Sequence, residues 1–177
     1  MIIWIDGANG VGKSHIAAKL AELLAYRNAE YVESDLYWED FRCNKNNFWK
    51  VILGAEPCKN KYFLSILREV LEKKRYDFGK ILIVSMSLVD KLCEKELLDY
   101  FKKKKESMFH IILEAKEETI ISRIENDPIR DKNAQNQQKP KVSWHIQHLE
   151  TNYPDAVRIN TEDKTLDEIV DEIMALL

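Results

Sequence analysis

The chain has 177 residues and a formal net charge of −3, with 45% hydrophobic and 32% charged residues. These values describe an ordinary globular protein and fit one domain, residues 1–177, with a sizeable core. The acidic balance argues against nucleic acid or a membrane surface as partner, because proteins that bind these usually carry a basic footprint. No apolar run approaches the roughly 20 residues of a membrane span, and the first apolar stretch breaks at Asp6, unlike a signal peptide. We therefore expect a cytoplasmic protein whose cysteines, Cys43, Cys58 and Cys93, are free thiols.

Strand and helix patterns alternate in the first half of the chain. A short buried strand is predicted over 2–5, and a helix with apolar residues at helical spacing begins near Lys13. A second strand and two helices are predicted over 30–33, 48–54 and 61–74. Between them, residues 34–47 are predicted to form a polar and aromatic loop.

The second half continues the alternation. Residues 80–86 (KILIVSM) form the clearest strand, continuously apolar as expected for a central parallel strand covered on both faces. A helix over 88–101 runs into four lysines, 102–105, and cations there complement a helix C-terminus, which favours a solvated helix end over a nucleic-acid patch. The later predicted elements are a strand over 108–115, a helix over 117–126, a helix containing Trp144 and Leu149, a strand over 156–159 and a final helix with the capping box Thr165–Glu168.

Residues 127–141 (DPIRDKNAQNQQKPK) interrupt this order. The segment is polar, contains two prolines and offers almost no residues to a core. Loops of this length inside a domain tend to be functional lids, so we expect a mobile lid at about 127–142. The remaining alternation predicts an α/β fold, a parallel sheet with helices on both faces, whose ligands bind at the carboxyl ends of the strands.

The stretch 7–14 (GANGVGKS) fits G-x-x-x-x-G-K-[ST] at every fixed position, with a strand before it and a helix after it. Its glycines let backbone N–H groups point at phosphate oxygens, Lys13 reaches the β- and γ-phosphates, and the Ser14 hydroxyl coordinates Mg²⁺. The alternative, a glycine turn that happens to precede a helix, would not explain every fixed position together with both flanks. The residues expected to bind ATP are Gly7, Ala8, Asn9, Gly10, Val11, Gly12, Lys13 and Ser14.

Several features favour phosphoryl transfer to a small acceptor over a motor or a GTPase switch. The chain is short, and it lacks the Asn-Lys-x-Asp motif that specifies guanine. Transfer needs water excluded and positive charge around the migrating group, which a lid with arginines provides. The candidates are Arg123, at the end of the helix before the lid, and Arg130, inside it. A solvated helix residue and a free loop charge are the respective alternatives.

Asp35 follows the second predicted strand and is the candidate for orienting or deprotonating the acceptor. It could equally cap the next loop, and Glu33 and Asp40 are weaker acidic alternatives. Aromatic residues around it are predicted either to stack on the acceptor or to pack in the core. These residues are Tyr37, Trp38, Phe41 and Trp49.

One expected acidic residue is missing. Ser85 occupies the position after the apolar run where many ATPases carry an aspartate, and Asp90 is expected to cap the following helix instead. We therefore expect Mg²⁺ to be held by Ser14, phosphate oxygens and waters, with help from Asp6 or Asp35.

The opening strand, loop and helix, the stretch HIILEAKEETIISRI and the closing RINTEDKTLDEIVDEI resemble the nucleoside, nucleotide and shikimate kinase group of P-loop proteins. Within that group, MIIWIDGANGVGKS, ILIVSMSLV and SWHIQHLE are similar to the tunicamycin-resistance protein family. The resemblance implies a three-layer P-loop NTPase fold with a five-stranded parallel sheet in the order 2-3-1-4-5, a lid, and an acceptor site beside the second strand.

The resemblance also carries over to single residues. Asp35 falls where many of these kinases place an acidic residue near the acceptor hydroxyl, and Arg123 falls where an arginine of the lid helix contacts phosphate; Arg130 is a further match. The positions that match the phosphate loop are Gly7, Gly12, Lys13 and Ser14.

The sequence thus predicts an ATP-dependent phosphotransferase acting on a small hydroxyl-bearing molecule such as a nucleoside, sugar or antibiotic. The alternative is an ATP-dependent binding protein that captures a nucleoside-like toxin such as tunicamycin without phosphorylating it. A slow regulatory NTPase is a third possibility.

Overall fold

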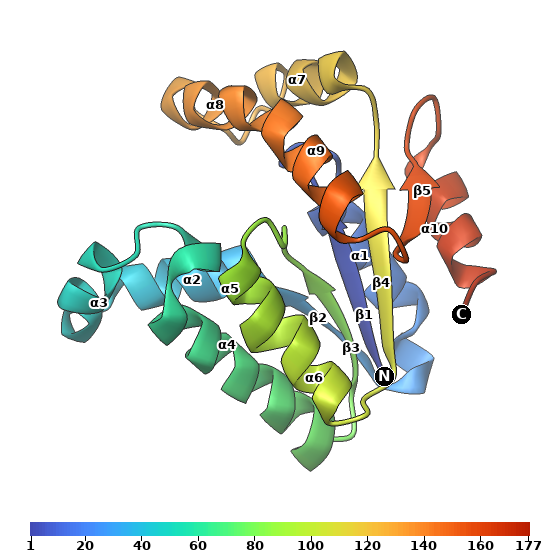
Figure 1. The fold of residues 1–177 in the computed structure, drawn as a ribbon. Helices are drawn as coiled ribbons and strands as arrows, with labels where there is room; N and C mark the ends of the chain where they lie inside the picture. The colour runs from blue at the N-terminus through green and yellow to red at the C-terminus, as the bar shows by residue number, and fades with distance from the viewer.

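A computed structural model describes residues 1–177. Five parallel strands form one sheet in the order β2-β3-β1-β4-β5, which confirms the order that the resemblance implied. Their carboxyl ends share the edge under α7, α8 and α9 (Figure 1). The strands are β1 (Ile2–Gly7), β2 (Ala29–Glu33), β3 (Ile81–Ser85), β4 (Met108–Glu114) and β5 (Val157–Asn160).

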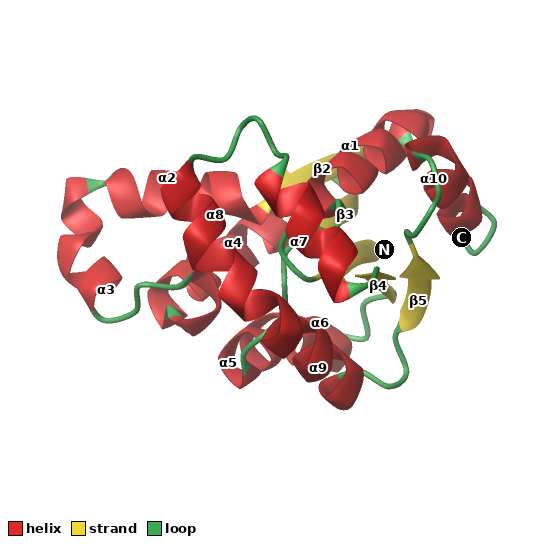
Figure 2. Ribbon diagram, turned by 90° about the horizontal axis from the view of Figure 1, so that it is seen from above, coloured by secondary structure: helices red, strands yellow, loops and turns green.

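Helices cover both faces of the sheet. Figure 1 shows α4, α5 and α6 in front of the strands and α1 and α10 behind them, and Figure 2 shows the same layers from above. The front helices are α2 (Ser34–Cys43), α4 (Lys61–Glu72), α5 (Lys91–Cys93), α6 (Asp99–Lys103) and α9 (Val142–Asn152). The others are α1 (Lys13–Leu23), α3 (Phe48–Ile52), α7 (Glu117–Glu125), α8 (Lys132–Gln138) and α10 (Leu166–Met174).

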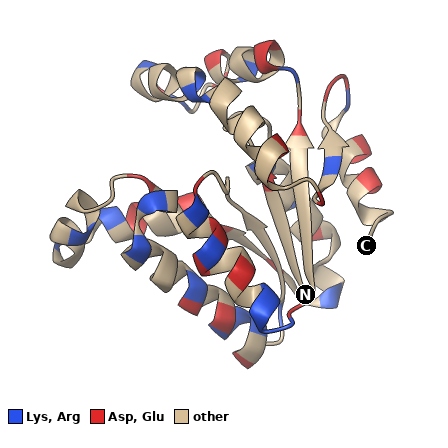
Figure 3. Ribbon diagram, in the orientation of Figure 1, with Lys and Arg blue, Asp and Glu red and all other residues tan.

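The strand β1 divides the core in two. Successive side chains of a strand point to opposite faces, so Ile2 and Trp4 join the cluster under α4 and α9, whereas Ile3 and Ile5 join the cluster under α1 and α10. All four are fully buried. Figure 3 shows that charged residues lie mainly on the helices and connections, as expected for a sheet covered on both faces.

The segment 34–47 is the first departure from the sequence prediction, because it forms the helix α2 and a short 3₁₀ turn where a loop was expected. The Ser34 hydroxyl donates to the carbonyl of Ser85 at 2.8 Å, which fixes the start of the helix on β3. Phe41 lies about two helical turns beyond Ser34, on the same face of α2, and is also buried. The helical period was hidden because short polar and aromatic residues, rather than aliphatic ones, mark the inner face.

The lid is the second departure. Residues 132–138 form the helix α8, followed by a 3₁₀ turn, where a structureless loop was expected. The side chain of Asp131 caps α8 by accepting from the Ala134 N–H at 2.7 Å. None of the residues of α8 is buried, so the sequence has no apolar stripe to indicate a helix.

The remaining elements lie close to their predicted bounds. Asp90 caps α5 by accepting from the Leu92 N–H at 2.8 Å, and the capping box of Thr165 and Glu168 is present at α10. The lysines 102–105 end α6 at the edge opposite the phosphate loop, where Lys104 pairs with Glu72. None of the helices combines the length and the apolar content needed to cross a membrane.

Phe63 tests the front core. It is fully buried against the rings of Trp38 and Phe41, with ring centroids at 5.1 and 5.8 Å. We expect Phe63→Ala to lower the free energy of unfolding by about 3–5 kcal/mol, because the truncated side chain leaves a cavity. The matched change Phe48→Ala, at a ring that is 59% exposed, should cost about 0.5 kcal/mol or less. Urea unfolding followed by circular dichroism measures both; equal losses would contradict this packing.

Candidate functional site

The loop between β1 and α1 needs glycine for its shape. Gly10 and Gly12 have φ angles of 91° and 108°, in the left-handed region that L side chains rarely adopt. A Cβ added to Gly10 would also lie 2.5 Å from Cγ1 of Ile124 on α7. No side chain caps the N-terminus of α1, so its backbone N–H groups remain available to an anion.

Lys13 lies across this loop. Its Nζ donates to the carbonyl oxygens of Gly7 and Ala8, both at 3.0 Å. Burial lowers the pKa of Lys13, while the nearby carboxylates of Asp6 and Asp35 oppose that shift. The ammonium is thus held beside the loop by two carbonyls, with acidic groups close enough to influence its charge.

Asp6 anchors the loop from below. Its Oδ1 accepts from the N–H groups of Gly7 at 2.7 Å and Leu88 at 3.1 Å, and Nε2 of His110 lies 3.0 Å from its Oδ2. Both oxygens of this fully buried carboxylate therefore have protein partners. Asp6 and Asp35 were the two carboxylates predicted to assist Mg²⁺, and the hydrogen bonds of Asp6 give it a structural role in positioning the loop.

Asp35 differs from Asp6 in both exposure and partners. It lies in the first turn of α2, is exposed to solvent, and its carboxylate accepts no hydrogen bond from the protein. Its charge nevertheless acts on Lys13. The predicted acceptor-side acid is therefore near the phosphate loop, and the alternative role as a cap has no hydrogen bond to support it.

The carboxylate of Glu33 lies beside Ser85, the position where the sequence lacks the expected acid. The register of β2 and β3 pairs Glu33 with Ser85, and the Ser85 hydroxyl donates to Oε1 of Glu33 at 2.8 Å. The Tyr31 hydroxyl bonds to the other oxygen. Sequence reasoning ranked Glu33 low, and only the strand register reveals this contact.

The predicted aromatic cluster does not form as one unit. Trp38 and Phe41 stack on each other and pack against Phe63, and Tyr37 packs partly buried against the same core. Trp49 points away on α3 and is 73% exposed. Of the two alternatives, core packing therefore describes Tyr37, Trp38 and Phe41.

The two predicted arginines have different surroundings. Arg123 reaches the loop from α7, donating to the Val11 carbonyl at 3.3 Å and to both oxygens of Thr161 at 2.9 Å. Arg130 pairs with Asp127 at 2.8 Å, and its charge lowers the pKa of Lys13. Arg123 therefore ties the loop to the segment after β5, while Arg130 brings positive charge from the lid toward Lys13.

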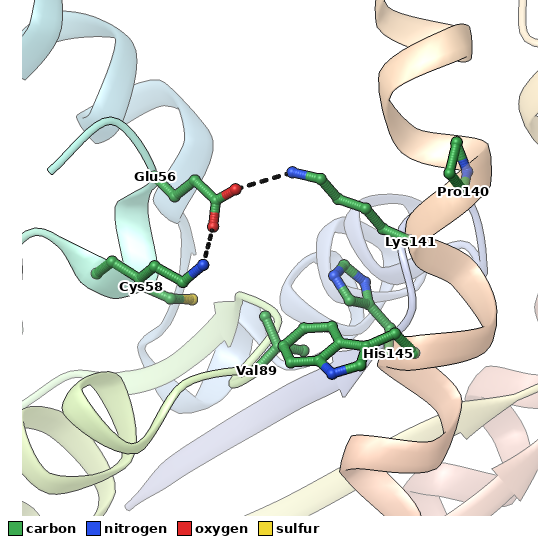
Figure 4. A pocket seen from close by; sticks show the side chains of 8 residues that line it. Glu56, Cys58, Val89, Pro140, Lys141 and His145 are labelled. Atoms are coloured by element: carbon green, nitrogen blue, oxygen red, sulfur yellow. Dashed lines mark hydrogen bonds and ion pairs between the residues drawn. The ribbon is translucent and has the colours of Figure 1, made fainter.

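A cavity of about 220 Å³ opens between α9 and the segment before α4. Figure 4 shows Lys141, the N-cap of α9, and His145 of α9 on the side of the cavity that faces Glu56 and Cys58. Pro140 and Lys141 belong to the predicted lid, and Lys141 was a weak candidate there; the other lining residues were not predicted to be site residues, because they come from separate segments. The lining residues are Glu56, Cys58, Lys59, Val89, Pro140, Lys141, Trp144 and His145.

His145 is the unusual residue of this cavity. Its side chain is buried, with 5% exposed, and Nδ1 has no hydrogen-bond partner. Burial lowers the pKa of His145 to about 4, and the positive charges of Lys13 and Lys141 add to the effect while Glu56 opposes it. The imidazole is therefore neutral at pH 7, and it lies close enough to Lys13 for the charge of Lys13 to lower its pKa.

This burial predicts a pH dependence of stability. Between pH 6.5 and 4 the unfolded chain takes up a proton at His145 more readily than the folded chain, so the free energy of unfolding should fall as the pH falls. The stability that neutral His145 contributes is fully present above pH 6.5. Between pH 6.5 and 4, the free energy of unfolding should fall by at most about 1.4 kcal/mol per pH unit. Urea unfolding at pH 7, 5.5 and 4.5 should give a shallower decline for His145→Asn than for the parent chain. Identical pH profiles would show that His145 does not titrate in this way.

Comparison with known proteins places the chain by its fold. No protein-family model matches it, and no curated protein matches its sequence significantly. A tunicamycin resistance protein from Deinococcus radiodurans has 21% identity and a TM-score of 0.72, with 99% of this chain and 94% of that chain covered. A gluconokinase from Sinorhizobium meliloti has 18% identity and a TM-score of 0.65, with 98% and 89% covered. A shikimate kinase from Bacteroides thetaiotaomicron has 16% identity and a TM-score of 0.64, with 99% and 97% covered. The chain therefore has the fold of the P-loop small-molecule kinases.

Proposed function

We propose that this protein is an ATP-dependent phosphotransferase that acts on a small hydroxyl-bearing molecule. The observation that carries the proposal is the placement of a free carboxylate, Asp35, in the electrostatic reach of Lys13 on the glycine-rich loop. A nucleotide-binding loop alone would need no such acid. The cavity lined by His145, on whose pKa the charge of Lys13 acts, offers space for an acceptor.

In the proposed reaction, the acceptor hydroxyl oxygen attacks the γ-phosphorus of ATP. The bond between that phosphorus and the β–γ bridging oxygen breaks, ADP leaves, and the hydroxyl proton passes to the carboxylate of Asp35. Lys13 and the N–H groups of the loop stabilise the charge on the transferring phosphoryl group. Arg130 adds positive charge from the lid, and Arg123 holds the loop through Val11 while lying next to the phosphate region.

The donor set near the loop fits Mg²⁺. Ser14 and Asp35 are exposed and have no protein partner, and no group of three or more His, Cys, Asp or Glu residues could hold a metal ion by itself. Magnesium is commonly bound by one or two protein groups together with phosphate oxygens and waters, which matches this sparse set. When bound, Mg²⁺ would neutralise charge on the phosphates.

The comparisons support transfer more than capture. Two of the solved structures described above are named kinases, although their low identity bears on the fold alone. The third is named a tunicamycin resistance protein, which keeps a toxin among the acceptors to be tested. No contact in the structure favours capture without transfer, whereas the unpartnered Asp35 suits proton removal.

The first test follows ³¹P NMR of the protein with Mg-ATP and a pool of nucleosides, sugars, shikimate-like acids and tunicamycin. We expect a new phosphoester signal that is about 100-fold slower to appear, or absent, with Lys13→Ala. Lys19→Ala on the same helix is the matched control, because Lys19 pairs only with Glu22 at the surface. Normal turnover by folded Lys13→Ala would refute the assignment of the loop.

Asp35 is tested with the acceptor found in this way. Asp35→Asn should lower kcat by about 10²–10⁴-fold, because the amide cannot take the hydroxyl proton. Asp40→Asn is the control, since Asp40 is an exposed acid on the same helix α2. Steady-state kinetics measure both variants, and equal kcat values for the two would assign proton removal to another group.

A further inference from the structure

The short helix α3 turns its large apolar side chains toward solvent. Four neighbouring residues, three in the helix and one at its C-cap, are between 57% and 73% exposed: Phe48, Trp49, Ile52 and Leu53. Residues four apart lie on one face of a helix, so these side chains form two adjacent rows. We call them the α3 stripe. A surface helix usually turns its apolar residues toward the core, so the arrangement of α3 is the reverse of the usual one.

The other side of α3 is fixed to the fold. Val51 packs against the front core, and the buried side chain of Asn47 donates to a carbonyl of α2 at 3.0 Å. The side chain of Asn60, also buried, donates to the carbonyls of Lys50 at 2.8 Å and Gly54 at 2.7 Å. The α3 stripe therefore belongs to a helix that is held from behind, and its exposure does not come from a loose loop.

The charge around the α3 stripe is positive. Residues 39–61 contain five lysines and arginines and three carboxylates, a net charge of +2 in a chain whose net charge is −3. Two of these carboxylates already pair with cations of the same segment. The acidic balance of the whole chain argued against a membrane surface as partner, but the local charge at α3 has the opposite sign.

Three lysines beside the α3 stripe have no carboxylate partner. Lys45 lies in the turn before α3, and Lys50 lies within the helix. Lys61 begins α4, and its Nζ lies 5.1 Å from the centre of the Tyr62 ring, over which Nζ of Lys50 also lies, at 5.9 Å. The two lysines are therefore neighbours in space, and all three offer positive charge to an anionic partner.

Charge and shape indicate the kind of partner. A second copy of the chain, docked stripe to stripe, would bring the same unpaired lysines face to face, which opposes self-association. Figures 1 and 2 both show α3 at the outer end of the molecule, where a flat surface can contact it. Tryptophan with aliphatic residues and flanking lysines is typical of segments that lie in the interface of anionic membranes.

We infer that α3 docks this protein on membrane surfaces that contain anionic lipids. The α3 stripe enters the boundary between headgroups and acyl chains, while Lys45, Lys50 and Lys61 face the charged headgroups. The inference is independent of the proposed phosphotransferase activity, because neither the phosphate loop nor Asp35 belongs to the docking surface.

The test measures binding of the full chain to unilamellar vesicles by co-flotation. Vesicles of phosphatidylcholine with about 30% phosphatidylserine are compared with vesicles of phosphatidylcholine alone. We expect partitioning onto the anionic vesicles to be about tenfold stronger or more, and most of it to be lost in about 0.5 M salt, because salt screens the lysines from the lipid charges. Tryptophan emission should shift to shorter wavelength on the anionic vesicles as the ring of Trp49 leaves water.

Paired variants connect binding to the α3 stripe. Trp49→Ser combined with Leu53→Ser should weaken partitioning onto anionic vesicles about tenfold or more, because less apolar surface enters the interface. The matched control is Tyr26→Ser combined with Phe78→Ser, which removes two exposed rings just before β2 and β3 and should bind as the parent chain does. Trp49→Phe should keep most of the binding and lose the emission shift. Circular dichroism checks that each variant is folded.

Several outcomes would overturn the inference. They are no binding to anionic vesicles, equal partitioning onto neutral and anionic vesicles, and undiminished binding by the folded Trp49→Ser, Leu53→Ser variant. Analytical ultracentrifugation without lipid tests whether a second copy covers the α3 stripe instead. A dimer that this double variant abolishes would also overturn the inference. Because no nucleotide is present in these experiments, a failure of the proposed phosphoryl transfer would leave their outcome unchanged.

Discussion

The buried carboxylate of Asp6 joins the central strands at the edge where the phosphate loop begins. It accepts from Gly7 and Leu88 and contacts His110 on β4. The circuit closes through Tyr153, whose ring packs edge-on against His110 at 5.0 Å and whose hydroxyl donates to the Leu88 carbonyl at 3.0 Å. A buried charge that lost one of these partners would be strongly destabilising. The end of β1, the segment after β3 and the first half of β4 are thereby held in one fixed arrangement.

The same circuit positions the wall of the cavity. Tyr153 is the C-cap of α9, and Val142 at the other end of that helix is fully buried, so α9 is fixed at both ends. His145 lies between these two points. On the opposite wall, Glu56 pairs with Lys141, the N-cap of α9. Both side chains are about half exposed, so this ion pair contributes little in water. The phosphate loop and His145 therefore belong to one framework, which an exposed ion pair joins to the Glu56 side.

The sequence predicted features whose chemistry is local. The loop 7–14 was found because its glycines, lysine and serine act within eight consecutive residues. The central strands were found because residues 2–5 and 81–84 are continuously apolar. The helix α8 was missed because none of its residues is buried, so no period exists to be detected. The unpartnered Nδ1 of His145 could not be predicted for a different reason. An unpartnered nitrogen is defined by what surrounds it, and its surroundings come from segments almost 90 residues apart.

Glu33 and Ser85, at the end of β2 and β3, also show why contacts between distant segments could not be predicted from the sequence. Along the chain, Ser85 stands where many ATPases carry an aspartate, so the sequence indicates no acid at this position. Parallel pairing puts Glu33 of β2 in register with Ser85, about 4.8 Å away across the sheet. The Ser85 hydroxyl donates to Glu33. The serine therefore carries no carboxylate of its own at this position but orients the carboxylate of Glu33. Because every strand of a parallel sheet ends at the same edge, a carboxylate of one strand can lie beside a position of its neighbour that carries none, and only the register reveals this.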